Sequence, residues 1–204
     1  MIAVAPVGGD KLPPEIAEKL AALYQEMEIG YDQVAAKIGL SCQGCPDNCC
    51  DSYFLHHTYI EWAYLWRGLA TLAPPVSETV MERARLCLDH YREATEAGVW
   101  PKIMCPLNQD GLCMLYLYRP MICRCHGVAA RLRRPDGKTL HFPGCFQCQE
   151  LTACSAAMAE MDRTPLLRRL ARLEEGFLGK RLGILPKMKM TLAAMLMAGP
   201  PELA

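Results

Sequence analysis

The feature that most constrains this chain is a cysteine-rich stretch between Met104 and Cys148. It holds six cysteines, and four more lie upstream in the segment S-C-Q-G-C-P-D-N-C-C. Glycine and proline flank many of them, which is typical of tight turns that aim sulfurs and backbone amides at a metal. We therefore interpret ten cysteines as candidate metal ligands. They are Cys42, Cys45, Cys49, Cys50, Cys105, Cys113, Cys123, Cys125, Cys145 and Cys148.

Local spacing groups these thiols into pairs. Two pairs have the C-x2-C spacing that zinc and iron–sulfur sites use, one beginning at Cys42 and the other at Cys145. The C-x-C pair that begins at Cys123 can place two sulfurs near one metal if the backbone is bent. The neighbours Cys49 and Cys50 point to opposite sides of an extended backbone, so the two have different roles. Ten thiols fill two four-ligand sites with two to spare, or one site with several structural cysteines.

The redox compartment follows from the cysteine usage and from the N-terminus. The first ten residues lack the basic start and the long apolar run of a secretory signal, and no apolar run in the sequence is long enough for a membrane span. We expect a cytoplasmic protein, where thiols stay reduced and twelve cysteines indicate metal rather than disulfides. An oxidised protein with six disulfides is the alternative, although adjacent and C-x-C cysteines are poor bridge partners.

Hydrophobic periodicity predicts a mainly α fold, in which a helical shell surrounds a cysteine-rich, largely irregular metal-binding centre with one or two short hairpins. We expect turns at residues 108–111 and 134–138, because both segments are rich in Asn, Asp, Gly and Pro. We expect a single domain over 1–204, with a loose arm at 1–12, the cysteine core at 42–148 and C-terminal helices over 150–198. The expected helices span 14–38, 58–72, 77–98, 150–162, 164–177 and 187–198.

Two cysteines and two capping signals belong to this helical shell. Cys87 and Cys154 each fall on the apolar face of an expected helix, so we assign both to the core rather than to a metal. The order Thr58-x-x-Glu61 has the form of a capping box, in which the hydroxyl and the carboxylate accept hydrogen bonds from backbone amides. Ser77 is the expected cap of the following helix.

The formal net charge is zero, but the charges are segregated. Residues 1–118 hold 8 basic and 15 acidic side chains, a balance of −7, whereas residues 119–189 hold 14 basic and 6 acidic, a balance of +8. The basic half is either a solvated surface or a surface for an acidic protein or an anionic small molecule. Nucleic acid is disfavoured, because few aromatic residues alternate with the arginines.

Four segments resemble, in order, the motifs of the bacterial CxxCxxCC family (the YkgJ type). They are C-Q-G-C-P-D-N-C-C, C-P-L, G-L-C-M-L-Y and R-P-M-I-C-R, within residues 42–148. The family is described as zinc- or iron-chelating and includes the flagellin lysine N-methylases. The most specific part of the match is G-x-C-x-x-Y-x-x-R-P-x-x-C-R.

The resemblance implies a set of ligands and two basic positions that accompany them, Arg119 and Arg124. Its methylase branch favours an iron–sulfur cluster, of the 4Fe-4S type. The first cysteine group has one extra residue before Cys49-Cys50, which leaves open which of these two ligates. Three candidate thiols are additional to the motif, and the long C-terminal region of the methylases is missing. The implied ligands are Cys42, Cys45, Cys49, Cys50, Cys105, Cys113 and Cys123.

Three functions are compatible with these residues. The residues do not decide whether the chain is an enzyme. The leading hypothesis is a cytoplasmic protein with one or two iron–sulfur clusters that serves redox or protein-modification chemistry. The second is a zinc-stabilised interaction or metal-handling module without catalysis, since zinc accepts the same four thiolates. The third is an S-adenosylmethionine-dependent protein N-methylase, although no Gly-rich strand-loop-helix motif suggests a cofactor pocket.

Overall fold

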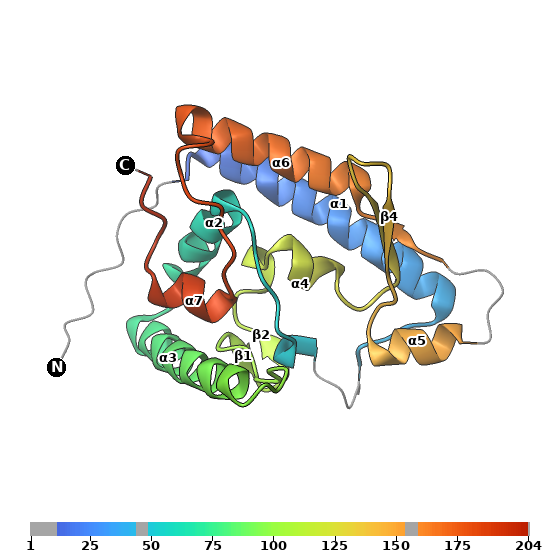
Figure 1. The fold of residues 1–204 in the computed structure, drawn as a ribbon, viewed down its shortest axis with the longest axis horizontal. Helices are drawn as coiled ribbons and strands as arrows, with labels where there is room; N and C mark the ends of the chain where they lie inside the picture. Colours follow the sequence, from blue (N-terminus) through green and yellow to red (C-terminus); the bar gives the residue numbers. More distant parts are fainter. Residues whose placement is uncertain (1–11, 44–48, 154–158, 204) are drawn as a thin grey trace. The chain divides into compact units, whose positions relative to one another are not determined.

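The computed structural model describes residues 12–43, 49–153 and 159–203. It is mostly helical, with 55% helix and 9% strand in small sheets (Figure 1). The mainly α class expected from the sequence is thus confirmed. Within the described ranges, no helix combines the length and the apolar character needed to cross a membrane.

The described chain forms two compact units, each assembled from segments that are far apart in the sequence. Unit 1 comprises residues 12–17, 50–120 and 174–203, and unit 2 comprises residues 18–43, 49, 121–153 and 159–173. Helices α1 (Pro14–Ile38) and α6 (Thr164–Leu178) have residues in both units. The expected single domain over 1–204 is not tested by this division and stays a prediction.

The remaining elements divide between the units. Unit 1 contains α2 (Tyr59–Leu69), α3 (Pro74–Glu96), α7 (Leu192–Met197), the 3-10 helices η2 (Tyr116–Tyr118) and η3 (Gly179–Arg181), and strands β1 (Asn108–Gln109) and β2 (Leu112–Cys113). Unit 2 contains α4 (Met121–Cys125), α5 (Phe146–Thr152) and strands β3 (Ala130–Arg133), β4 (Thr139–Phe142) and β5 (Met161–Asp162). The 3-10 helix η1 (Cys49–Asp51) begins at the last residue of a unit 2 segment.

Helix α1 has the bounds that its apolar spacing predicts. Leu20, Leu23 and Met27 are fully buried along one face, and Gly39 ends the helix with a φ of 69° that favours glycine. Tyr31 continues the same face one turn after Met27 and is half-buried. The apolar face of the helix therefore carries two tyrosines, the buried Tyr24 and the half-buried Tyr31.

Helix α2 begins with a cap from another helix. The Glu174 carboxylate on α6 accepts hydrogen bonds from the backbone amides of Tyr59 and Ile60, both at 2.8 Å. The Thr58 hydroxyl does not accept from an amide; it donates to Glu61 Oε2 at 2.7 Å. The expected role of the Thr58 hydroxyl in a capping box is therefore wrong, and a carboxylate from a distant segment accepts hydrogen bonds from the first amides of the helix.

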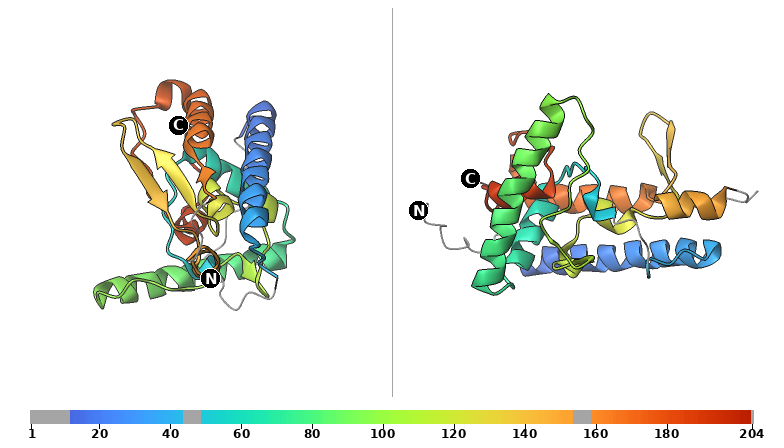
Figure 2. Two further views of the ribbon diagram at one scale, coloured as in Figure 1. Left: turned by 90° about the vertical axis from the view of Figure 1, so that its right-hand side faces the viewer. Right: turned by 90° about the horizontal axis from the view of Figure 1, so that it is seen from below.

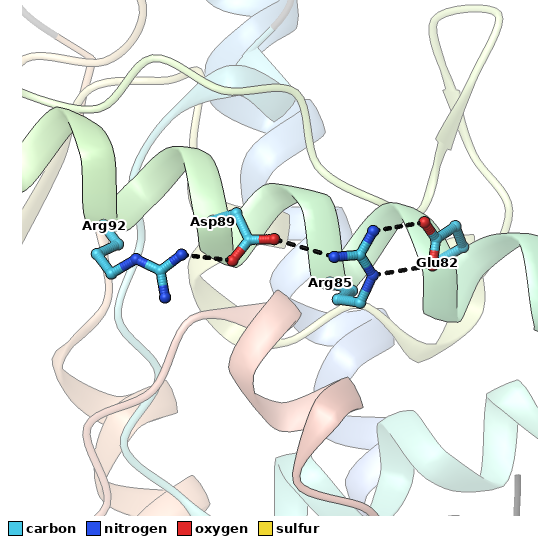
Figure 3. A network of polar contacts seen from close by, with 4 residues as sticks. All are labelled: Glu82, Arg85, Asp89 and Arg92. Carbon is cyan, nitrogen blue, oxygen red and sulfur yellow. Dashed lines mark hydrogen bonds and ion pairs between the residues drawn. The ribbon is translucent and has the colours of Figure 1, made fainter. Parts of the chain in front are cut away.

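Helix α3 starts earlier than expected and packs against α7. The proline pair at its start occupies the first helical turn, where a missing N–H costs nothing, and Ala73 rather than Ser77 is the cap. Its inner face contains the buried residues Val80, Ala84 and Cys87. A ladder of ion pairs with N···O distances of 2.8–3.1 Å lies on another, more exposed face of the helix (Figure 3). The ladder joins Glu82, Arg85, Asp89 and Arg92.

Both expected turns close hairpins. The β1–β2 loop is Asp110-Gly111, with φ of 53° and 85°, as a tight two-residue turn requires. The β3–β4 pair is antiparallel around the second turn and is seen as adjacent strands in the left view of Figure 2. β5 adds to β3 in parallel, through Met161 N–H donating to the Ala129 carbonyl at 2.9 Å.

The helix expected over 150–162 is wrong. Helix α5 ends at Thr152, and Met161 lies on a strand. The spacing of apolar residues suggested a helix, but Met161 and Asp162 pair with the backbone of β3 instead. Side-chain spacing cannot reveal such hydrogen bonds to a distant strand. Cys154 lies outside the described residues. The last helix is also shorter than expected: it begins after Thr191, whose hydroxyl accepts from Ala194 N–H at 3.2 Å.

Candidate metal centre

Nine of the ten candidate ligands lie in the described residues, and they divide between the units; Cys45 lies outside. Unit 1 contains Cys50, Cys105 and Cys113. Unit 2 contains Cys42, Cys49, Cys123, Cys125, Cys145 and Cys148. Chain order alone did not indicate this division, because the boundary falls between the neighbours Cys49 and Cys50.

In unit 2, Tyr31 lies beside the thiol of Cys42. Its hydroxyl is hydrogen-bonded to the Cys42 sulfur, with an Oη···Sγ distance of 3.8 Å. Burial raises the pKa of Tyr31, and the negative charges that Cys42, Cys145 and Cys49 can carry raise it further. The phenol therefore stays protonated at neutral pH and is a hydrogen-bond donor for a thiolate.

Gly127 connects Tyr31 to the second C-x2-C pair. A Cβ at Gly127 would lie 2.5 Å from Tyr31 Oη, and the glycine has a φ of 118° that other residues rarely adopt. The Gly127 carbonyl accepts the Cys145 N–H at 3.0 Å. The missing side chain thus allows the phenol of α1 to approach the backbone that binds Cys145.

The pair Cys145-x2-Cys148 begins helix α5. Cys145 is the N-cap residue and Cys148 lies three positions later, so the two cysteines lie on the same side of the first turn. A Cβ at Gly144 would lie 2.7 Å from Cys148 Sγ, so glycine is needed there. Burial raises the pKa of Cys148, a hydrogen bond from the Ala129 backbone lowers it, and Cys145 raises it.

The expectation for Cys123-x-Cys125 is corrected by helix α4. Both cysteines lie on this short helix, where positions two apart differ by about 200° around the axis. Cys125 is buried and Cys123 is half-buried. Because the backbone is helical rather than bent, the two sulfurs point to nearly opposite sides and do not chelate one metal as a pair.

In unit 1, the chain brings Cys50 beside Cys105. The Cys105 N–H donates to the Cys50 carbonyl at 2.9 Å, and Cys113 pairs with Asn108 across the β1–β2 hairpin. Tyr91 on α3 lies near Cys105, which adds to the rise in the pKa of Tyr91 that burial causes. The expected turn therefore joins two cysteine-bearing segments within this unit.

Cys87 lies in the apolar core, as its place on the face of α3 predicts. It is 3% exposed, burial raises its pKa, and the Tyr91 hydroxyl one turn later is its hydrogen-bond partner. A thiol held in its neutral form by burial is a small hydrophobic side chain rather than a ready metal ligand.

The two arginines of the R-P-x-x-C-R segment have partners of their own. Arg119 Nε donates to the Tyr116 carbonyl at 3.1 Å, and its guanidinium carbon lies 3.5 Å from the centre of the Tyr116 ring. Arg124 is buried on α4, forms an ion pair with Glu28 of α1, and lies 4.1 Å from the centre of the Tyr24 ring. These contacts give both arginines a structural role.

Among residues 12–43, 49–153 and 159–203, no three cysteine, histidine or carboxylate side chains are placed so that they could hold one metal ion. Thiols are the donor type that thiophilic metals prefer, and unit 2 contains six of the candidate cysteines. His126 is half-buried immediately after α4.

The sequence interpretation missed Tyr31 and Gly127. A signal for Tyr31 exists, because a tyrosine one turn after Met27, near the end of the helix, places a hydroxyl close to the first cysteine group. No local signal marks Gly127, whose role depends on α1. In comparisons with known proteins, no family model, curated protein or solved structure matched this chain.

Proposed function

We propose that this chain is a cytoplasmic, thiolate-ligated metalloprotein that holds one or two iron–sulfur clusters. The observation that carries the proposal is the series of contacts from the Cys42 sulfur to Tyr31, from Tyr31 to Gly127 and from the Gly127 carbonyl to the Cys145 N–H, which joins two cysteine segments about a hundred residues apart in the sequence. Cysteines that only fill a core do not need such an arrangement, and Cys87 on α3 shows what a core cysteine of this chain looks like.

The resemblance to the CxxCxxCC family supports iron–sulfur over other thiophilic groups, since its methylase branch uses such a cluster. When bound, the cluster would supply one-electron redox chemistry. The residues of this chain would hold it through their sulfurs, shield it by the apolar face of α1 and donate hydrogen bonds to thiolates from Tyr31 and the Ala129 amide. Redox or protein-modification chemistry would follow from that cluster.

Zinc is the second candidate, because four thiolates also suit a tetrahedral zinc site. Exposure of Cys42 and Cys49 is compatible with a metal-handling module that takes up and releases an ion. The basic half is partly neutralised by its own carboxylates, as in the Arg131–Asp162 pair at 3.3 Å, so binding of an anionic partner there is the weaker part of the proposal.

Anaerobic purification followed by metal analysis tests the proposal. Brown protein with iron and acid-labile sulfide supports the iron–sulfur proposal, and colourless protein with zinc supports the second candidate. Protein that contains neither metal after reconstitution under reducing conditions would refute both. A variant with Cys87→Ala is the matched control, because it removes a thiol of the core and should keep the metal content of the parent protein.

A further inference from the structure

The segment of unit 1 that follows helix α6 exposes aliphatic side chains at a turn (Figure 1). It spans residues 179–189, with the sequence G-K-R-L-G-I-L-P-K-M-K, and is called the basic–apolar loop below. Ile184 is 79% exposed and Leu182 is 50% exposed. Gly183 lies between them with a φ of 92°, and a Cβ there would meet no heavy atom within 4 Å apart from its chain neighbours. The tip of the loop is therefore apolar and open.

Backbone and side-chain contacts hold the basic–apolar loop in place on both sides of its tip. Leu178, the last residue of α6, is buried immediately before the loop. Within the turn, the Ile184 N–H donates to the Arg181 carbonyl at 2.9 Å. After the tip, the Tyr59 hydroxyl of α2 donates to the Pro186 carbonyl at 2.8 Å. The exposure of the aliphatic tip is thus built into the fold of this unit, although apolar surface in water is unfavourable.

Four cations flank the apolar tip, two on each side along the chain. No acidic residue occurs in the sequence between Glu175 and Glu202. All four cations are exposed, and none of them belongs to an ion pair within the described ranges. A cluster of like charges without nearby carboxylates attracts an anionic surface. The four cations are Lys180, Arg181, Lys187 and Lys189.

We propose that the basic–apolar loop is a docking surface for an anionic lipid bilayer. The aliphatic side chains at the tip would leave water and enter the boundary between the headgroups and the acyl chains. The flanking lysines and arginine would contact the lipid phosphates, as cations beside a membrane surface do. This inference goes beyond the proposed function and does not rest on it, because the loop contains none of the candidate metal ligands.

A bilayer fits this loop better than a protein or a nucleic acid. Two exposed aliphatic side chains cover far less than the roughly 800 Å² that each partner buries in a standard protein interface. A bilayer needs no complementary pocket, because its acyl chains rearrange around an inserted side chain. Single-stranded nucleic acids stack their bases on aromatic side chains, and residues 179–189 contain none. The combination of an aliphatic tip and flanking cations therefore indicates anionic lipid.

Vesicle flotation of the full-length chain tests the proposal. Partitioning is measured into vesicles of equal parts phosphatidylglycerol and phosphatidylcholine, and into vesicles of phosphatidylcholine alone, at low and at high salt. The parent chain should float with the anionic vesicles at low salt and bind the neutral vesicles far more weakly. High salt should weaken the binding to anionic vesicles, because it screens the attraction between exposed charges.

Two variants measure the apolar and the charged contributions, and a third is the matched control. Ile184→Gln should lower the partition coefficient about tenfold, because the tip loses an aliphatic side chain that would leave water. Lys187→Gln/Lys189→Gln should lower it roughly 25-fold, about fivefold for each cation. Leu112→Gln should leave it unchanged, since Leu112 is 74% exposed in the same unit but follows Asp110-Gly111 instead of cations. Far-UV circular dichroism checks that each variant is folded.

The same measurements can overturn the proposal in three ways. A parent chain that does not float with anionic vesicles at low salt would show that the loop is no lipid surface. Equal losses for Ile184→Gln and Leu112→Gln would show that any lipid binding lies elsewhere. Polyuridylic acid is the probe for nucleic acid: if it binds the parent chain but not Lys187→Gln/Lys189→Gln, and vesicles do not bind, the cations serve a nucleic acid and the proposal is wrong.

Discussion

Two tyrosine–cysteine hydrogen bonds, one in each unit, differ in almost everything except their chemistry. In unit 1, Tyr91 and Cys87 lie one turn apart on α3, and the thiol is buried against other apolar side chains. In unit 2, Tyr31 lies on α1, and Cys42 lies beyond the end of that helix and is exposed. The first pair lies within one helix and its thiol is buried. The second pair connects a helix to a segment without regular structure.

The comparison shows what makes a cysteine available to a metal. Burial raises the pKa of Cys87 and keeps its thiol neutral, which favours packing. Cys42 follows Gly39, off the apolar face of the helix, and is exposed. The hydrogen bond to tyrosine is common to both pairs, so position along the helix and exposure of the thiol decide the role.

Removal of metal should have the largest effect and should separate the two units. Structural thiolate sites contribute on the order of 10 kcal/mol of binding free energy to folding. A strong chelator should therefore lower the thermal transition and expose the amides around Cys145 to hydrogen exchange, whereas α3 amides near Cys87 stay protected. An unchanged thermal transition after complete metal removal would show that the thiols of unit 2 do not order it.

Acid should lower the stability of unit 1, because this unit buries the neutral side chain of His56. His56 is 1% exposed, and burial first and His57 second lower its pKa from 6.5 to about 4. Between pH of about 6.5 and 4, the His56 side chain is protonated in the unfolded chain but neutral in the folded protein. The free energy of unfolding therefore falls as the pH drops through this range. The loss should approach roughly 3 kcal/mol. Denaturant unfolding at several pH values measures it, and His56→Leu should remove this part of the slope.

Arg124→Ala should destabilise unit 2 without loss of metal. The guanidinium is buried in its ion pair with Glu28 and lies over the Tyr24 ring, but Glu28 is partly exposed, so we expect a cost of about 2 kcal/mol. Arg131→Ala, which breaks an exposed pair with Asp162, is the control and should cost far less. If Arg124→Ala loses as much metal as Cys145→Ser, Arg124 serves the metal directly.

Cys87→Ala should have the smallest effect and sharpens the comparison of the two pairs. It removes a buried sulfur from α3 and should cost about 1 kcal/mol of stability, with metal content unchanged. Cys42→Ala, at an exposed position, should cost little packing energy but lower the metal content. Thermal unfolding and metal analysis of the two variants side by side give the answer. Equal metal loss in both would remove the distinction between a core thiol and a ligand.

The sequence by itself determined the elements whose signals are local. The bounds of α1 follow from the spacing of Leu20, Leu23 and Met27 and from Gly39, all of which act within a few turns of one helix. The hairpin turn at Asp110-Gly111 follows from its residues, because few others adopt a positive φ twice in succession. Assignment of Cys87 to the core follows from the apolar face of α3 in the same way.

Only the tertiary structure decided the contacts that join distant segments. The cap of α2 by Glu174, the pairing of Met161 with Ala129 and the approach of Tyr31 to Gly127 each link residues about thirty or more positions apart. Side-chain spacing carries no record of such partners. For that reason the sequence named ten candidate thiols, while the division of these thiols between two units, and the phenol beside Cys42, came from the fold.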